Sequence, residues 1–450
     1  DDIRTWGLPR LFDEIGKHFE AALESKEQLL DTPIEEYGEL LDMGTAPAEY
    51  RPTLYDFLAF EALSFYSSGE QAGATPEDAF VLEASSPVFG SLDDFLGWEI
   101  ATTDTDSPIY KALTLYQALL RTRRNADAPA ALADADLHRL RFGGNHAVGP
   151  EKTNRYLDAL AKFATDHADH PIWARAQYLR ADALRDEGKL VEAQKIAAAA
   201  MEAYPDSVGG KRCFNLNQQL QTPALTVHTE RVWNAPWPDI QVDYKNLTEL
   251  HFRIVELEWV DPSEWQRDGA PEAIDRDRMK RLLEQEPAAA WSTELPATED
   301  FQMARHAISV PEDLPNGLYA LIGSPDADFQ EEDNQVSATA FWVSGLAVVV
   351  TSHTADGKAG GHVLDGRSGA PLAGARVKHW FYGRRRNWRD GGTVQTDENG
   401  EFDVQVGERA RNSIFVVEQE GDRLASGSIW QSRSSAHQRN PSEVTVLFTD

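Results

Sequence analysis

Residues 171–205 read PIWARAQYLRADALRDEGKLVEAQKIAAAAMEAYP, and this stretch decides the architecture of the first half of the chain. Pro171 and Pro205 lie 34 residues apart, with apolar residues at helical spacing between them. Small side chains recur there, at Ala181, Ala193 and Ala200. They allow two antiparallel helices to approach closely, while Gly188 opens the turn and Pro205 ends the second helix.

A period of 34 residues is typical of tetratricopeptide repeats, in which helix pairs stack on one another. We therefore predict a tetratricopeptide-like repeat at about 172–206. The segment that ends at Pro171 fits the same pattern more loosely, with Ala159 and Phe163 in the corresponding places. The prediction is one well-formed repeat preceded by a degenerate one.

Helix-start signals also occur earlier in the chain. Thr53 and Asp56 have the spacing of a capping box, in which each side chain bonds the other residue's backbone N–H. Ser107 and Pro108 form an N-cap followed by proline in the first turn. These signals predict an all-α helical-repeat domain over residues 1–221.

After Thr222 the apolar pattern changes to alternation with a period of two, which is typical of half-buried strands. We predict a β-sandwich over residues 222–344. A charged stretch at about 262–296 interrupts it, and the apolar spacing there indicates a helical insertion, at Met279, Leu282 and Leu283.

Turn signals dominate the last part of the chain. Glycines in Ser368–Val377, and Asn399-Gly400 within Thr396–Phe402, supply the positive φ angles that tight turns need. We predict a second, smaller antiparallel β-sandwich over residues 345–450. The predicted fold class is multidomain α plus β, with an N-terminal all-α helical-repeat domain followed by two antiparallel β-sandwich domains.

Composition limits the partners. The chain has 450 residues, with 74 Asp and Glu against 43 Lys and Arg, so its formal net charge is −31. Such a surface repels phosphate backbones and anionic lipid, which disfavours nucleic-acid and membrane-surface binding. No apolar run is long enough for a membrane span, and the chain starts at Asp1 without a signal peptide. We expect a signal or lipoprotein segment to have been removed.

Several segments, read in order, resemble the N-terminal region of bacterial alpha-2-macroglobulin family proteins. They are RPTLYDFLA at 51–59, EEDN at 331–334, FWVS at 341–344, and the turns Ser368–Val377 and Thr396–Phe402. The resemblance covers essentially the whole chain. It implies that residues 345–450 form a macroglobulin-like or carboxypeptidase-regulatory-like sandwich.

The resemblance also implies a function. The chain would be a non-catalytic scaffold of an extracytoplasmic protease inhibitor that traps its target, located in the periplasm or at the cell surface. Target proteases would be bound through the full-length chain, and another envelope protein through the helical repeats. The family's thioester cluster, Cys-x-Glu-Gln, has no match, because Cys213 is followed by Phe-Asn-Leu. No protease bait region is identified either.

Motifs for catalysis and for cofactors were not found, so we predict no enzyme and no cofactor. A hydrolase with paired carboxylates between Pro262 and Pro296 stays open as an alternative. Metal ligands were considered at His167 and His170 with neighbouring Asp residues, and at an acidic loop for calcium, Asp326, Asp328, Glu331, Glu332 and Asp333. A solvated helix end and a solvated loop are the favoured interpretations, so we predict no metal.

The sequence RRRNWR at 384–389 is a basic and aromatic cluster in an acidic protein. Its candidate partner-binding residues are Arg384, Arg385, Arg386, Trp388 and Arg389. They suit an anionic partner or a glycan, with Trp388 as a stacking platform, which would favour a cell-surface adhesin or carbohydrate-binding module. A plain exposed hairpin tip is the alternative.

Overall fold

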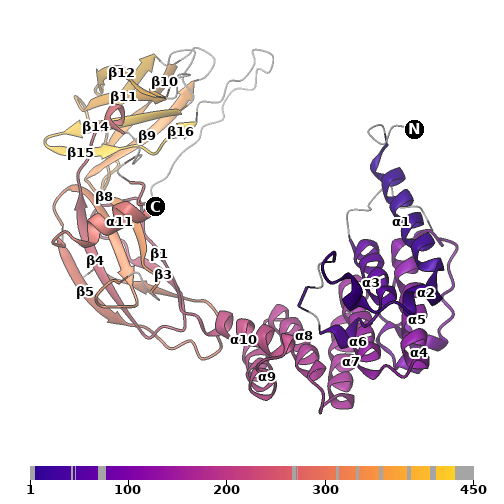
Figure 1. Ribbon diagram of the computed structural model, residues 1–450. Coiled ribbons are helices and arrows are strands. Elements are labelled where there is room, and N and C mark those ends of the chain that lie inside the picture. Colours follow the sequence, from indigo (N-terminus) through magenta and orange to yellow (C-terminus); the bar gives the residue numbers. More distant parts are fainter. Residues whose placement is uncertain are drawn as a thin grey trace. The chain divides into compact units, whose positions relative to one another are not determined.

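The computed structural model describes residues 6–41, 44–45, 47–68, 78–265, 270, 272–310, 314–330, 334–353, 358–382, 387–405 and 412–430. Its contacts divide the chain into two compact units, Asp1–Gln221 and Thr222–Asp450. Helices build the first unit and β-sheets build most of the second (Figure 1). The predicted multidomain α plus β class is therefore confirmed.

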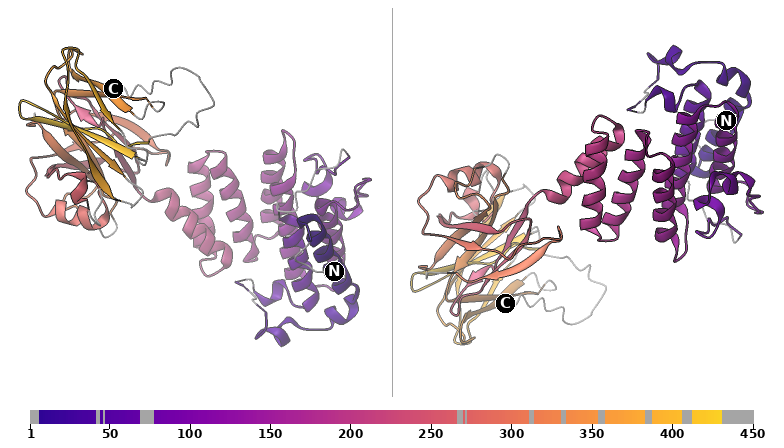
Figure 2. Two further views of the ribbon diagram at one scale, coloured as in Figure 1. Left: turned by 90° about the horizontal axis from the view of Figure 1, so that it is seen from above. Right: turned by 90° about the horizontal axis from the view of Figure 1, so that it is seen from below.

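The helical unit consists of successive helices that pack against their neighbours in the chain (Figure 2). The helices are α1 (Leu8–Glu24), α2 (Lys26–Leu30), α3 (Leu54–Ser67), α4 (Leu92–Gly97), α5 (Pro108–Asn125), α6 (Pro129–His146), α7 (Lys152–Asp166), α8 (Ile172–Asp186), α9 (Leu190–Ala203) and α10 (Val208–Gln221). Short 3-10 turns are η2 (Ile34–Tyr37), η3 (Ala48–Tyr50) and η5 (Pro87–Phe89).

The predicted helix starts are present. The Asp56 carboxylate accepts hydrogen bonds from the backbone N–H and the hydroxyl of Thr53, at 2.9 and 2.8 Å. The same carboxylate lies 2.7 Å from Nε of Arg123 on α5, and both side chains are buried. Burial raises the pKa of Asp56, although Arg123 opposes the shift. The cap of α3 is thereby joined to α5 by a buried ion pair.

The helix pair expected from the spacing of the two prolines is α8 and α9. Gly188 lies between them at a φ of +74°, and the three alanines of the pattern are fully buried, at Ala181, Ala193 and Ala200. Helix α10 packs on both members of the pair. A Cβ atom on Gly209 would overlap the backbone of Ala174, and one on Gly210 would overlap the carbonyl of Tyr204.

The first sandwich of the second unit contains two sheets, ordered β1-β3-β6 and β2-β8-β7-β4-β5. Its strands are β1 (Ala224–His228), β2 (Val232–Trp233), β3 (Ile240–Lys245), β4 (Glu249–Leu257), β5 (Ala289–Glu294), β6 (Ala304–Ile308), β7 (Gly317–Ser324) and β8 (Ser337–Val343). Except for the parallel contact of β2 with β8, the strands pair antiparallel. One apolar cluster fills the space between the sheets, with Trp233, Tyr244, Phe252 and Phe341 among its members.

The stretch expected as an insertion at about 262–296 is only partly helical. It contains η6 (Pro262–Glu264) and α11 (Arg276–Leu283), followed by β5, which pairs with β4. Strand β5 alternates between more and less buried residues, but only Ala289 is buried, because β5 is the last strand of its sheet. The helical part therefore ends well before Pro296, where the prediction had placed its limit.

The second sandwich begins directly after β8. Its sheets are ordered β13-β10-β9 and β12-β11-β14-β15, with β16 also paired to β14. The strands are β9 (Leu346–His353), β10 (Lys358–Asp365), β11 (Arg376–Tyr382), β12 (Trp388–Gln395), β13 (Glu401–Gln405), β14 (Asn412–Gln419), β15 (Asp422–Ala425) and β16 (Ile429–Trp430). The final strand expected at Val444–Phe448 lies outside the described residues.

Two strands of this unit are buried on both faces. Residues 318–324 of β7 and 413–417 of β14 are buried without interruption, although successive side chains of a strand point to opposite faces. Phe415 faces the opposite sheet through Phe402, at a ring distance of 5.5 Å. The second face of β7 and the core of the second sandwich belong to one apolar cluster, so the two sandwiches share a core.

A chain of aromatic rings continues this shared core. Trp342, Trp259, Trp265, Trp388 and Tyr382 contact one another in that order, with successive ring centroids 5.4 to 5.9 Å apart. Their residues come from β8, the segment after β4, and the β11–β12 hairpin. Aromatic side chains bury much apolar area in specific tilted or edge-on contacts, so this chain helps to fix the two sandwiches to each other.

Substitution of either glycine at the start of α10 should destabilise the helical unit. In Gly209→Ala and Gly210→Ala the new methyl group meets backbone atoms, which cannot move aside as a side chain can. We expect a loss of about 1–3 kcal/mol in the free energy of unfolding. Urea denaturation of each variant, together with hydrogen exchange in α10, measures it.

Gly97→Ala is the matched control, because a Cβ atom at Gly97 would enter open space at the end of α4. Its free energy of unfolding should change by less than about 1 kcal/mol. Equal behaviour of all three alanine variants would contradict the close approach of α10 to α8 and α9.

The second sandwich should lose stability in mild acid because of His379 on β11. This side chain is fully buried, and burial lowers its pKa to about 4, although Asp390 opposes the shift. Below a pH of about 6.5, His379 is protonated in the unfolded chain but stays neutral in the folded chain. The free energy of unfolding therefore falls between about pH 6.5 and 4, by up to ~3 kcal/mol. Denaturation at a series of pH values, with His379→Gln for comparison, tests this. An identical pH dependence of both proteins would exclude His379 as the cause.

Candidate binding groove and the predicted sites

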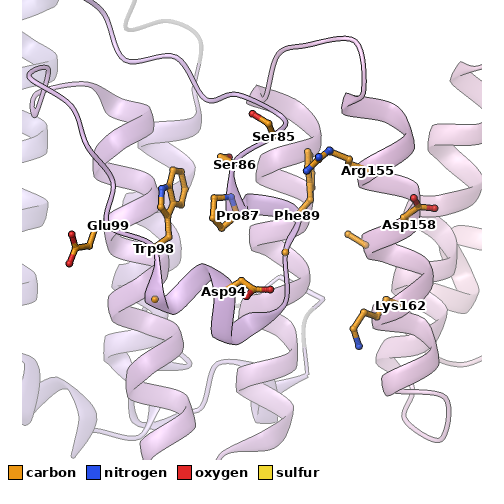
Figure 3. Close-up of a pocket in the computed structure, with 13 residues that line it drawn as sticks. Ser85, Ser86, Pro87, Phe89, Asp94, Trp98, Glu99, Arg155, Asp158 and Lys162 are labelled. Carbon is orange, nitrogen blue, oxygen red and sulfur yellow. The ribbon is translucent and has the colours of Figure 1, made fainter.

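A groove of about 790 Å³ opens on the helical unit between residues 85–99 and helix α7 (Figure 3). Pro87 and Phe89 of η5 form its base together with Trp98, which directly follows α4. The ring of Phe89 also contacts Tyr156 of α7, at a centroid distance of 5.9 Å. The base of the groove is therefore apolar and aromatic.

One acidic group at the groove, the carboxylate of Asp94, takes part in the N-terminal cap of α4. Asp94 accepts hydrogen bonds from the hydroxyl and the backbone N–H of Ser91, at 2.6 and 3.2 Å, and so completes the capping box of α4. These hydrogen bonds lower the pKa of Asp94. A carboxyl group whose pKa is lowered stays ionised at neutral pH and is a poor general acid.

The opposite wall of the groove carries charges of both signs. Arg155, Asp158 and Lys162 follow one another along the same side of α7, as Figure 3 shows. Lys162 is already paired with Asp166, one turn further on, at 2.7 Å. An aromatic base beside mixed charges suits binding of a polypeptide segment more than it suits catalysis.

A second hollow, of about 330 Å³, lies next to the groove and shares Phe89, Gly90 and Lys162 with it. Arg139 lines this hollow and donates hydrogen bonds to the backbone carbonyls of Val88 and Gly90, at 2.9 and 3.1 Å. The buried guanidinium thus fixes the segment that forms the base of the groove. Sequence analysis missed this site, because its walls are assembled from separate helices and no local motif marks them.

The predicted basic cluster is only partly described. Arg384, Arg385 and Arg386 lie outside the described residues, whereas Trp388 and Arg389 begin β12. Arg389 is exposed. The half-buried ring of Trp388 contacts the rings of Trp265 and Tyr382 edge-on, each at 5.4 Å. Trp388 therefore packs at the joint between the sandwiches, a contact that the sequence did not predict.

The acidic loop considered for calcium is also partly described, because Glu331, Glu332 and Asp333 lie outside the described residues. Asp326 accepts a hydrogen bond from the backbone N–H of Asp328 at 3.1 Å, which is a local turn interaction. Within the described ranges no group of three or more His, Cys, Asp or Glu residues is placed to hold a metal ion.

The histidines at the end of α7 make local contacts. His167 packs on the ring of Phe163 at 4.3 Å, and burial lowers its pKa. The Nδ1 atom of His170 accepts a hydrogen bond from the backbone N–H of Ile172, at the start of α8. Cys213 is fully buried in α10, and burial raises the pKa of its thiol to about 12, so the thiolate needed for nucleophilic attack is disfavoured.

The segment between Pro262 and Pro296, in which a hydrolase site was considered, contains Glu272, whose carboxylate has hydrogen-bond partners. Glu272 accepts hydrogen bonds from Nε1 of Trp342 and from Arg231, at 2.8 and 2.7 Å. These bonds tie the segment before α11 to the second face of the sheet that contains β8. Glu272 therefore contributes to holding the helical segment in place.

No protein-family model matches the chain, and no curated protein matches it. The structure is similar to a crystal structure of Escherichia coli alpha-2-macroglobulin spanning domains MG0-NIE-MG1, at a TM-score of 0.34 and 12% identity, covering 46% of this chain and 64% of that fragment. For a crystal structure of the same E. coli protein spanning NIE-MG1, the TM-score is 0.35 and the identity is 11%. The match covers 46% of this chain and 97% of that fragment.

The native conformation of the same E. coli protein, from electron cryo-microscopy, gives a TM-score of 0.27 and 10% identity, and this chain covers 12% of its length. The chain thus spans less than two thirds of the first of these structures and a small part of the third. None of the helices in the described ranges combines the length and apolarity that a bilayer crossing requires.

Trp388→Ala should loosen the joint between the sandwiches. The substitution removes a half-buried ring that contacts two other aromatic rings. We expect the free energy of unfolding to fall by about 2 kcal/mol. Calorimetry of the intact chain, together with hydrogen exchange in β11 and β12 to identify the transition of the second unit, provides the measurement.

Arg389→Ala is the control, since this neighbouring side chain is exposed, and it should change stability by less than about 0.5 kcal/mol. A Trp388→Ala protein of unchanged stability that has lost binding to a glycan array would instead identify Trp388 as a stacking platform.

Proposed function

We propose that this chain is a non-catalytic scaffold from the N-terminal region of an extracytoplasmic, alpha-2-macroglobulin-like protease inhibitor. The observation that carries the proposal is the shared core of the two sandwiches, in which β7 and β14 are buried on both faces. Such a core makes the second unit a continuous body. A trap that closes around a protease needs wall segments of this kind.

The segments that resemble the family support a structural role, because their described residues cap helices, fill cores or shape turns. Thr53 and Asp56 cap α3, and Phe341 and Trp342 are buried in the sheet that the two cores share. Gly400 has a φ of +71° in the turn before β13. Residues that determine packing and turns are what a scaffold would retain.

Support for a non-catalytic role comes from the local partners or the burial of three groups of reactive type. Cys213 is buried with a raised pKa, Asp94 is bound in a helix cap, and Glu272 is bonded to Trp342 and Arg231. Each of these side chains has a structural partner or is shielded from solvent. The proposal therefore assigns protease binding to the full-length protein, and this chain contributes to the walls.

The helical unit would position the scaffold on a second protein of the cell envelope, in the periplasm or at the cell surface. The groove beside α7 is the surface we assign to that contact. Its aromatic base and its walls of mixed charge suit a polypeptide with an apolar anchor.

The chain alone should inhibit no protease. Enclosure of a protease needs walls on all sides, and a single wall segment leaves the active site open to substrates. Endoproteases of several specificities are mixed with excess chain, and hydrolysis of a large protein and of a small peptide is followed. Both rates should stay unchanged.

Selective loss of hydrolysis of the large substrate would show that this chain encloses the enzyme, which contradicts its assignment as a partial wall. Turnover of a peptide or glycan library by the chain itself would contradict the non-catalytic assignment. In the control for simple crowding, a covalently inactivated protease of about the same size as the chain is added in place of the chain.

A further inference from the structure

A strongly basic hollow lies within the helical unit of a protein whose net charge is −31. It has a volume of about 170 Å³, and its lining includes four arginines and a histidine: Arg51, His138, Arg141, Arg175 and Arg212. We call these five residues the arginine pocket. No carboxylate occurs among the described residues that line this hollow.

The arginine pocket is assembled from four separate parts of the helical unit. Arg51 directly follows η3, and His138 and Arg141 are one turn apart on α6. Arg175 belongs to α8 and Arg212 to α10. Four like charges at one place repel one another, so their convergence costs free energy unless a compensating negative charge is present.

Internal compensation is incomplete. The fully buried Asp134 of α6 accepts a hydrogen bond from Arg175, and its other oxygen lies 3.7 Å from Nε of Arg51. This Nε atom is buried and has no hydrogen-bond partner among the described residues. Asp134 therefore faces two guanidinium groups. Glu61 and Asp56 also act electrostatically on Arg51, but neither lines the hollow, where Arg141 and Arg212 are exposed.

The pKa of His138 is affected by the positive charges around it. Nη2 of Arg175 lies 3.1 Å from Nε2 of His138, which accepts the hydrogen bond when the imidazole is neutral. Burial lowers the pKa of His138 well below its usual range, and Arg175, Arg51, Arg141 and Arg212 all lower it further. Asp134 is the nearby carboxylate, 3.8 Å from Nε2.

Aromatic rings hold the guanidinium groups in place. Arg51 lies over the ring of Phe60 at 3.9 Å, and Arg212 lies 5.6 Å from the centre of the Tyr178 ring. Such contacts restrict a long side chain before any ligand arrives, so less conformational entropy is lost on binding. The donors of the arginine pocket are thus pre-organised around an electropositive space.

We propose that the arginine pocket binds one oxyanion group, a carboxylate or a phosphate, of a small ligand. Guanidinium groups match the planar or tetrahedral oxygens of these groups through paired, charge-assisted hydrogen bonds. A ligand anion would supply the missing negative charge between Arg51, Arg141 and Arg212.

The surroundings limit the size and the charge of the ligand. A larger hollow of about 810 Å³ lies beside the arginine pocket and shares Arg175 and Arg212 with it. This larger hollow gives room for the remainder of a ligand. Glu49 and Asp206 line that larger hollow together with Lys211. These carboxylates, and the acidic surface beyond, would repel a polyanion, so the site fits a ligand with a single anionic group rather than a nucleic acid.

Titration of the intact chain with inorganic phosphate and with succinate, followed by calorimetry at low ionic strength, tests the proposal. We expect saturable binding of at least one of the two probes. The double variant Arg141→Gln/Arg212→Gln should bind it about tenfold more weakly or worse, since it removes two charge-assisted contacts. Preference for phosphate or for succinate identifies the source of the anionic group.

The control variant is Arg124→Gln/Lys195→Gln, which changes the net charge equally and removes two exposed cations that do not line the hollow. It should keep the affinity of the natural chain to within about twofold. Equal weakening by both double variants, or absence of binding to the natural chain at millimolar concentrations of both probes, would overturn the proposal.

A measurement on the natural chain does not depend on the folding of any variant. A bound anion offsets the charge of the surrounding arginines, so the pKa of His138 should rise when the binding probe is added, as followed by the NMR signal of its imidazole. An unchanged pKa of His138 under saturating probe would place the bound anion elsewhere and overturn the assignment.

Discussion

Burial of β7 and β14 on both faces is the constraint on which the second unit depends. A strand in an ordinary sandwich turns one face to solvent, but here consecutive side chains of both strands lie in apolar surroundings. The two sandwiches therefore cannot separate without exposing the face that carries Ala320 and Trp342. The ion pair of Lys378 with Asp261, at 2.7 Å, and the hydrogen bonds from Ser344 and Gly345 to Asp422 strengthen the same joint.

The helical unit depends on a different constraint, which is the small distance between helix backbones. Buried alanines at the contact of α8 and α9 and the glycine pair that begins α10 leave no space for larger side chains. Charged side chains are buried in the same unit where each has a partner, as Asp56 and Arg123 have. In the arginine pocket, by contrast, the single buried carboxylate of Asp134 faces two guanidinium groups, those of Arg175 and Arg51.

Local signals made much of the fold predictable. The capping residues Thr53 and Asp56, the turn at Gly188 and the alternation in β3 and β4 each act over a few residues, and the structure contains all of them. The sites were not predictable in this way. The members of the arginine pocket are spread from residue 51 to residue 212, and Trp388 meets Trp265 across more than a hundred residues of chain. Only the packing of distant elements creates such neighbours, so spacing along the sequence carries no trace of them.

The aromatic chain at the joint has an optical consequence. Trp259, Trp265, Trp342 and Trp388 lie close enough for their excited states to interact and exchange energy. Light absorbed by one indole therefore migrates among several, and the near-ultraviolet dichroism and the emission of the protein depend on the mutual orientation of the rings. These two spectra therefore indicate whether the two sandwiches keep their native contact with each other.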